Sequence, residues 1–411
     1  WIELPLGAGL PDVSFSRFAF VVLVSLVALA GDRLRGPARL GGAEIVGCLA
    51  VACIVITVAR SGSPLQTVQA TATRFLLPVL AFYLARRLIT TRSRLVALTV
   101  GMCLLGGAAG TYTLYEYRTG EVRFVPNERE LTERDLARAG DPDMRRIRGV
   151  AGSTGSMGRL LATTLLATLF LALERWRYRS RALALLTGLI ALQCIALLAT
   201  LSRAAWLGLV VGVAVLLLTH PSGRRLVLPA LLAAALFLGV AGASRLGGQA
   251  VARLTDEVST PQGRVARWVT GVAMWRERPI LGWGSGGFPR HSRQYLPDFE
   301  GRHSGYNAVE SDYLELLVEG GLVALLPYAL FLGLPLAQSL GLQRRIGAGK
   351  PVGWLETQDL SLYWSTLACF LVVTSTAATN QPLIRTLVFA VTGAVVGLPS
   401  VLAADEGSGD R

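Results

Sequence analysis

Charged residues are scarce in this sequence. They make up 16% of its 411 residues, whereas soluble globular domains carry about 25%. Hydrophobic residues account for 52%, and the mean hydropathy is +0.49. The shortage of charge therefore excludes an ordinary soluble enzyme and predicts an integral membrane protein.

Histidine and cysteine are also few, and their positions disfavour a metal-dependent membrane hydrolase. The three histidines form no HExxH motif, and the five cysteines form no CxxC motif. All five cysteines lie inside apolar runs, which is typical of inert small core residues. We expect no metal ion and no other cofactor. The residues concerned are His220, His291 and His303, and Cys48, Cys53, Cys103, Cys194 and Cys369.

Long apolar runs are what the sequence has in quantity. They include residues 18–30, 45–59, 160–173, 182–200, 206–218 and 226–243. With its flanks, each run is long enough for a membrane span of roughly 17–25 residues. We predict an all-α membrane bundle of about eleven spans. Because the chain begins with Trp1 and a polar segment, we expect a twelfth span before it in the full protein.

Arginine clusters fall on alternate loops between these runs. Cytoplasmic loops of membrane proteins collect Lys and Arg, so the alternation predicts a topology. It places the C-terminal tail inside, and residue 1 and two long segments, 118–152 and 244–310, outside. The net charge of +13 fits basic inner loops, and we expect no nucleic acid partner. The clusters are Arg33, Arg35 and Arg39; Arg86, Arg87, Arg92 and Arg94; Arg175, Arg177, Arg179 and Arg181; Arg224 and Arg225; and Arg344, Arg345 and Lys350.

This topology predicts the organisation of the whole chain. Residues 1–117 hold spans one to four, and 118–154 form the first outer loop. Residues 155–243 hold spans five to eight, and a large outer loop with an amphipathic helix follows at 244–312. Residues 313–404 hold the last three spans, and 405–411 form a cytoplasmic tail.

The large outer loop carries the signature of a helix. Thr260 is a suitable N-cap, Pro261 fits the first helical position, and Pro279 stops the run. Apolar residues recur at helical spacing and form one face, while Arg264 and Arg267 fall on another. This pattern is also typical of a helix that lies on the membrane surface with solvated arginines. The apolar face consists of Val265, Trp268, Val269, Val272 and Trp275.

Two further segments contain features that favour an anion. The run GWGSGGF (282–288) is either a phosphate-binding nest of backbone N–H groups or a plain turn. Arg203, in LSRAAW (201–206), stands between two apolar runs, where an ionisable residue usually has a function or a specific partner. Because Arg binds phosphate in a bidentate manner, several outer arginines would suit a pyrophosphate group.

Carboxylates gather where the chain re-enters the membrane. Glu310, Asp312, Glu315 and Glu319 lie within ten residues. On a helix Glu310 would share a face with Tyr313. Either Ser311 or Asp312 would serve as the N-cap of the span, and Glu315 and Glu319 would be explained by pairing with arginines inside the protein.

Three local patterns together resemble one family. LSRAAW is similar to its Ser-Arg motif after a span. Residues 263–288 resemble its outer-loop order of Arg, then Trp, then a Pro-Ile/Leu-Leu-Gly-x-Gly turn, and ESDYLELLVEGG (310–321) resembles its segment re-entering the membrane. The family is the O-antigen ligase and polymerase superfamily. The resemblance covers about residues 70–400 in topology, with the specific motifs mainly in 145–330.

The resemblance implies a membrane glycosyltransferase. Such an enzyme transfers a glycan from an undecaprenyl-pyrophosphate carrier to an acceptor hydroxyl, on a glycan or a lipid, at the outer face of the bacterial cytoplasmic membrane and without a metal ion. Arg203 matches the Ser-Arg arginine and Arg264 the loop arginine, both associated with the pyrophosphate, and Arg148 is similar to a third arginine. The further candidate substrate-binding residues are Arg267, Tyr313 and His303.

One position departs from the family's ligases. Where they carry a His that begins the His-Asn/Ser-x-Tyr/Leu-Leu pattern, this chain has Glu310. We therefore predict a polymerase-like or divergent member, with Glu310 as the base that accepts the proton of the incoming hydroxyl. His303, seven residues upstream, is an alternative to replace the missing histidine. The alternatives for Glu310 are a role in binding or orienting an arginine and a position as a solvated loop residue.

Two other classes of protein stay open. A transporter or flippase of lipid-linked saccharides also has many spans and an arginine-lined cavity. It predicts charges deep within several helices and inverted repeats, whereas the ionisable residues here cluster at outer ends. A non-catalytic membrane subunit is the other alternative, and total loss of activity on changing Arg203 would argue against it.

Overall fold

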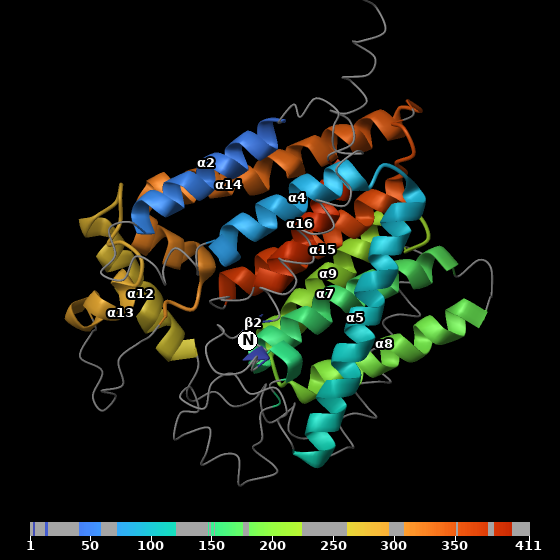
Figure 1. Cartoon of the computed structure of the whole chain (residues 1–411), viewed down its shortest axis with the longest axis horizontal. Coiled ribbons are helices and arrows are strands. Elements are labelled where there is room, and N and C mark those ends of the chain that lie inside the picture. The colour runs from blue at the N-terminus through green and yellow to red at the C-terminus, as the bar shows by residue number, and fades with distance from the viewer. Residues whose placement is uncertain are drawn as a thin grey trace, which may run out of the picture. The chain divides into compact units, whose positions relative to one another are not determined.

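The computed structural model describes residues 3–4, 13–14, 41–58, 72–120, 147, 149–151, 153–175, 181–223, 261–295, 308–350, 352–376 and 382–396. Helices form nearly all of the regular structure in these residues, as predicted (Figure 1). The strands among them are β1 (Glu3–Leu4) and β2 (Val13–Ser14), which pair antiparallel with Glu3 opposite Ser14.

The chain divides into two compact units. Unit 1 comprises Trp1–Asp32, Thr91–Asp256 and Thr357–Val372, and unit 2 comprises Arg33–Thr90, Glu257–Glu356 and Val373–Arg411. The helices that lie in unit 1 are α5 (Arg92–Thr119), η3 (Gly149–Ala151), α7 (Thr154–Arg175), α8 (Arg181–Ala199), α9 (Arg203–Thr219) and most of α15 (Thr357–Thr376). Those of unit 2 are α2 (Gly42–Val58), η1 (Ala72–Leu76), α4 (Leu77–Leu88), α12 (Pro261–Glu277), α13 (Gly287–His291), η6 (Ser292–Tyr295), α14 (Asp312–Gly347) and α16 (Pro382–Val396).

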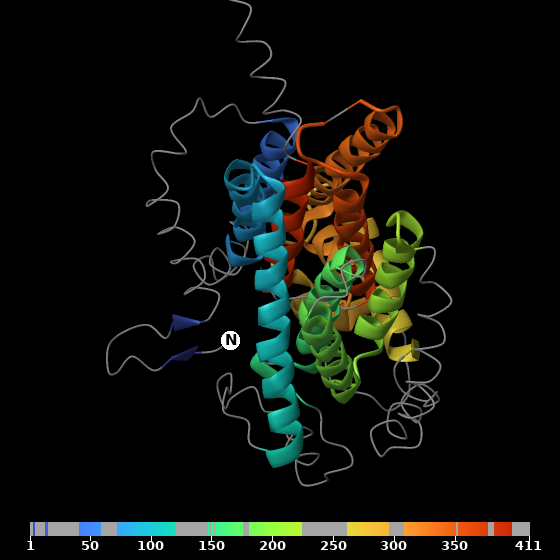
Figure 2. The same cartoon turned by 90° about the vertical axis from the view of Figure 1, so that its right-hand side faces the viewer.

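In unit 1 the helix α7 forms the core. It packs against α5, α8 and α9 (Figures 1 and 2), and 89% of its most apolar 18-residue window is buried. Small residues allow the close approach that holds membrane helices together. A Cβ atom on Gly106 of α5 would lie 2.5 Å from the Oε1 atom of Gln193 on α8. Gln193 in turn links the hydroxyls of Thr164 and Thr168 on α7, at 3.0 Å each.

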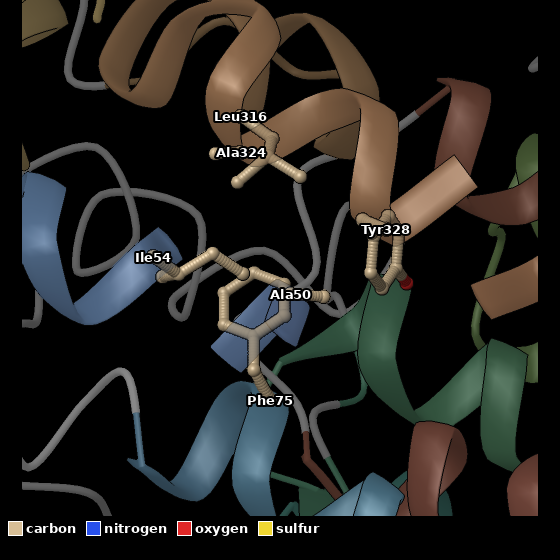
Figure 3. Packing of buried hydrophobic residues seen from close by; sticks show 6 residues of the cluster. All are labelled: Ala50, Ile54, Phe75, Leu316, Ala324 and Tyr328. Carbon is tan, nitrogen blue, oxygen red and sulfur yellow. The ribbon is translucent and has the colours of Figure 1, made fainter. Parts of the chain in front are cut away.

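In unit 2 the long helix α14 forms the frame. The helix α2 lies along α14, and α4 lies along α16 (Figure 1). A buried cluster joins α2, η1 and α14, and it contains Phe75 in edge-to-face contact with Tyr328, with ring centroids 5.7 Å apart (Figure 3). Aromatic contacts of this kind add to the free energy of burial, so the part of α14 around Tyr328 is firmly packed within unit 2.

A kink at Gly321 divides α14, and the run GWGSGGF explains how it is tolerated. Gly321 has φ +63°, which breaks the helix. A kink leaves backbone groups without helical partners, and these need other bonds. The segment from Pro279 to Gly284 supplies them: Leu322 N donates to Pro279 O at 2.9 Å, and Gly284 N donates to Glu319 O at 2.8 Å. The glycine-rich run is therefore the partner of the kinked helix.

Four of the described helices are long and apolar enough to cross a membrane, namely α5, α7, α8 and α14. Three shorter apolar helices lie at Gly42–Thr57, Arg203–Thr219 and Ile384–Val396. The predicted span around residues 75–86, whose apolar stretch is short, corresponds to η1 and α4. The predicted runs 18–30 and 226–243 lie outside the described residues, and the total of about eleven spans stays a prediction.

Ion pairs within each unit join helix ends that the predicted topology places on the same side of the membrane. The order of crossings itself stays a prediction. Which side is cytoplasmic stays a prediction. The pairs are Glu44 with Arg86 and Arg92 with Glu174 at predicted inner ends, and Arg74 with Asp312 at predicted outer ends.

We expect Gly321→Ala to lower the free energy of unfolding by roughly 1–3 kcal/mol, because a side chain is strained at positive φ. A Cβ atom there would also lie 2.2 Å from Ile280 O. The control is Gly333→Ala in the same helix, where a Cβ atom would meet nothing within 4 Å. That change should raise stability by about 0.5–1 kcal/mol. Thermal unfolding of the purified protein in detergent measures both, and equal melting temperatures would contradict the account of the kink.

Candidate functional site

Glu310 lies directly before α14 and is bound by two arginines of α12. Arg264 Nε lies 2.9 Å from Glu310 Oε2, and Arg267 Nη1 donates to Glu310 Oε1. The side chain of Arg264 is 32% exposed, that of Glu310 is 31% exposed and that of Arg267 is 26% exposed. Two cations and one anion leave one positive charge in this cluster. A partly desolvated group of this kind is suited to an anionic ligand that approaches from solvent.

The backbone at Glu310 is strained. Its φ of +58° lies in the left-handed region that non-glycine residues avoid. Among the described residues the same holds for one other non-glycine residue, Leu201, with φ +51°. Leu201 stands two residues before Arg203. Such conformations cost on the order of 1–3 kcal/mol and gather at functional sites, so the strain marks both segments that the sequence had singled out.

The helix α12 begins at Pro261 and ends at Glu277, which confirms the predicted helix between the two prolines. The predicted N-cap, Thr260, lies outside the described residues. The predicted apolar face packs inward only in part: Trp268 and Trp275 pack against the buried cluster that contains Met274, whereas Val265 and Val269 are 52% and 56% exposed.

The face that carries the arginines is the one that packs on α14. Ala266, Thr270 and Met274 are buried, and a Cβ atom on Gly271 would lie 3.1 Å from Leu314. Small residues allow α12 to lie close to the start of α14. This packing brings Arg267 beside Glu310, so that Arg264 and Arg267 are paired with a carboxylate and only partly exposed to solvent.

A second ionic cluster holds the first turn of α14. Arg74 of η1 donates from Nη2 to Asp312 Oδ1 at 3.0 Å and from Nη1 to Glu315 Oε1 at 2.7 Å. Arg385 of α16 donates to Asp312 Oδ2 at 2.5 Å. The carboxylates of Glu315 and Asp312 thus face the partly buried positive charge of Arg74. The predicted pairing of Glu315 with an arginine is confirmed.

The start of α14 differs in detail from the pattern predicted for Glu310. Ser311 is the N-cap, since its hydroxyl accepts from Leu314 N at 3.5 Å. Glu310 therefore precedes the helix and does not share a helical face with Tyr313. The Tyr313 hydroxyl forms a 2.8 Å hydrogen bond with the Thr374 hydroxyl in the last turn of α15.

The glycine-rich run is a turn, and the anion at its N–H groups belongs to the chain itself. Gly282, Gly284 and Gly286 all have positive φ. Gly286 N donates to the side chain of Glu319 at 2.8 Å, while Gly284 N donates to the backbone oxygen of Glu319. These two N–H groups are engaged within the fold, so the interpretation as a phosphate nest is not supported at them.

Arg203 is the first residue of α9 in unit 1. Its N-cap, Ser202, has extended backbone and makes no side-chain capping bond. The N–H groups of a helix start favour an anion. The turn before α9 packs on α7, where a Cβ atom on Gly158 would lie 2.8 Å from Ser202 Cβ. Arg203 thus stands in unit 1, whereas Arg264, Arg267 and Glu310 stand together in unit 2.

Arg148 and His303 lie outside the described residues. The residues beside Arg148 are held in place, because Ile147 is fully buried and Gly149 N donates to the buried Glu116 at 2.8 Å. No group of three or more His, Cys, Asp or Glu side chains is arranged for a metal ion among the residues that the structure describes.

Neither Arg385 nor Arg74 was among the site residues predicted from the sequence. Arg385 is 1% exposed and stands in an apolar segment after Pro382. The rule that singled out Arg203, that an ionisable residue between apolar runs has a function or a partner, applies equally to Arg385. Its partner, Asp312, becomes evident only when α16 and α14 are seen together.

Residues 188–329 match the family model described as O-antigen ligase. This match, over about a third of the chain, supports the resemblance to the O-antigen ligase and polymerase superfamily. No curated protein sequence matches it. The family supports a membrane protein that ligates or polymerises glycans in polysaccharide assembly.

The part of the chain that matches the O-antigen ligase family contains both strained segments and both arginines of the Glu310 cluster. It extends from α8 through α9 and α12 to the middle of α14. Arg74 and Arg385, which hold the first turn of α14, lie outside it. The family match therefore covers the Glu310 cluster and the carboxylates of the second ionic cluster, but not the two arginines of the latter.

We expect Glu310→Gly to be more stable than Glu310→Ala by about 1 kcal/mol, because glycine adopts positive φ without steric cost. Both variants lack the carboxylate, so the difference between them isolates the backbone strain. The control pair is Ala329 against Ala329→Gly on the exposed surface of α14, where glycine should destabilise by about 1 kcal/mol. Thermal unfolding measures the four proteins, and equal stability of the Glu310→Ala and Glu310→Gly variants would contradict a strained Glu310.

Proposed function

We propose that this protein transfers or polymerises a glycan that is linked to undecaprenyl pyrophosphate. The acceptor is a hydroxyl group of a glycan or lipid, and the reaction takes place at the outer face of the bacterial cytoplasmic membrane. The observation that carries the proposal is the strained Glu310 held by Arg264 and Arg267 within the range that matches the O-antigen ligase family.

The arginines supply the charge that the leaving group requires. In a direct displacement the acceptor oxygen attacks the anomeric carbon, and the bond from that carbon to the pyrophosphate oxygen breaks with its electron pair. Positive groups that face the developing negative charge lower the barrier. Arg264 and Arg267 fulfil this role in unit 2, in place of a metal ion. Arg203 is the proposed pyrophosphate ligand in unit 1, and Arg148 is a further one.

Glu310 accepts the proton of the incoming hydroxyl in this mechanism. Both of its carboxylate oxygens are engaged by arginines in the structure, so the base is masked before the donor arrives. Arginine binds phosphate oxygens in the same bidentate geometry as a carboxylate. An arriving pyrophosphate therefore replaces the Glu310 carboxylate as the partner of the guanidinium groups. A carboxylate oxygen then becomes free to take the proton.

The presence of Glu310 where the family's ligases carry a His favours a polymerase-like or divergent member. A carboxylate accepts a proton without acquiring a positive charge, whereas a histidine base becomes cationic. The neutral acid that Glu310 forms would have no repulsion with the two arginines beside it. Glu310 is thus compatible with an arginine-rich site in a way that a protonated histidine would not be.

We expect Glu310→Gln to lower kcat by roughly 10²–10⁴-fold, the usual contribution of a general base. Arg264→Ala should lower it by about 10²–10³-fold through loss of charge stabilisation, and Arg203→Ala should also reduce activity strongly. The measurement is polymer formation from lipid-linked repeat units in reconstituted vesicles. The control is Arg276→Ala, an exposed arginine in the last turn of the same helix, which should keep near-normal activity.

Full activity of the Glu310→Gln variant would exclude Glu310 as the base. Vesicles that move the lipid-linked saccharide across the bilayer but form no polymer would favour the transporter alternative. Equal losses in the Arg264→Ala and Arg276→Ala variants would show that general positive charge, and not the Glu310 cluster, supports the reaction.

A further inference from the structure

We propose that Asp312 is a positioning residue that holds the strained backbone of Glu310 in place beside the two arginines of α12. The inference rests on the proposed function, because it assigns Asp312 a role through Glu310. Asp312 is the first residue of α14 and stands two positions after Glu310. Its side chain is 3% exposed, so it has no access to a substrate in solution.

Asp312 is fixed by two elements that are far away in the sequence. Its Oδ1 atom accepts from Arg74 in η1 at 3.0 Å, and its Oδ2 atom accepts from Arg385 in α16 at 2.5 Å. Arg385 also donates to the backbone oxygen of Arg74 at 3.3 Å. The three residues form a closed arrangement, and it leaves the first residue of α14 little freedom to shift.

Glu310 is fixed on the other side by α12. Its carboxylate binds Arg264 and Arg267, and Ser311 in extended conformation connects it to Asp312. Strained backbone persists only where the surroundings determine it from more than one side. With one residue between the two anchors, release of Asp312 allows Glu310 to relax to negative φ and to turn its carboxylate away from the arginines.

Loss of the Asp312 charge would weaken its contacts with both Arg74 and Arg385. Arg74 keeps a partner, since it also donates to Glu315 at 2.7 Å and 3.1 Å. The substitution Asp312→Asn preserves the shape of the side chain and removes its charge. Because a displacement of about 1 Å at a reacting group costs roughly 100-fold in rate, we expect kcat to fall by about 10–100-fold. The KM for the lipid-linked donor should change by less than about threefold.

The decisive experiment is a double-mutant cycle between Asp312→Asn and Glu310→Gln. If Asp312 acts through Glu310, the substitution at 312 lowers kcat in the wild-type background and has little further effect once residue 310 is glutamine. Additive losses would overturn the proposal. The matched control is Glu44→Gln, which breaks another buried ion pair of unit 2. This pair joins Glu44, in the first turn of α2, to Arg86, in the last turn of α4. The control should leave kcat per folded molecule unchanged.

A second measurement separates this proposal from the proposed function. Hydrogen exchange of the segment around Ser311 should become faster in Asp312→Asn and stay unchanged in Glu44→Gln. Faster exchange together with a fully active Glu310→Gln variant would retain the positioning role and refute the base. Unchanged exchange with an inactive Glu310→Gln variant would refute the positioning role and retain the base. Should Asp312→Asn fail to fold, Arg385→Lys weakens the same contact and is expected to give the same two results.

Discussion

The structure of unit 2 depends on the pairing of carboxylates with arginines at the start of one membrane helix. A carboxylate at the entrance to a bilayer loses hydration and requires a cation or hydrogen-bond donors. Three elements meet this requirement: α12 binds Glu310, while η1 and α16 bind Asp312. Each pairing ties α14 to a different neighbour. The same charges that make the entrance costly therefore determine which helices surround it.

The kink in α14 follows from a related constraint. A break in a helix leaves polar backbone groups that must find partners within the protein. Glycines at 282 and 321 allow the loop after α12 to come close enough to provide them, because a side chain at either position would collide with the opposite backbone. The loop that supports the kink thus also fixes the end of α12. The arginines at the beginning of that helix are consequently presented to Glu310 by packing on both sides.

Much of the secondary structure was predictable from local patterns. The prolines at 261 and 279 bracket α12 because proline fits a helix start and ends a run, and the apolar runs around α7 and α8 gave helices with similar limits. The inward face of α12 was not predictable from hydrophobicity. Periodicity ranks side chains by their preference for water, whereas packing on α14 also depends on small residues such as Gly271, which permits close approach to Leu314.

The sequence by itself predicted a helical membrane protein that resembles the O-antigen ligase and polymerase superfamily, with Arg264 and Glu310 as candidates for its chemistry. Composition and local motifs suffice for these conclusions because they depend on residue types and on spacings within one segment. Only the tertiary structure decided that Glu310 is bound by two arginines and that Asp312 is held by Arg74 and Arg385. These contacts join residues that are 43 to 238 positions apart in the sequence. Only the packing of helices brings such residues together, and local sequence patterns do not specify that packing.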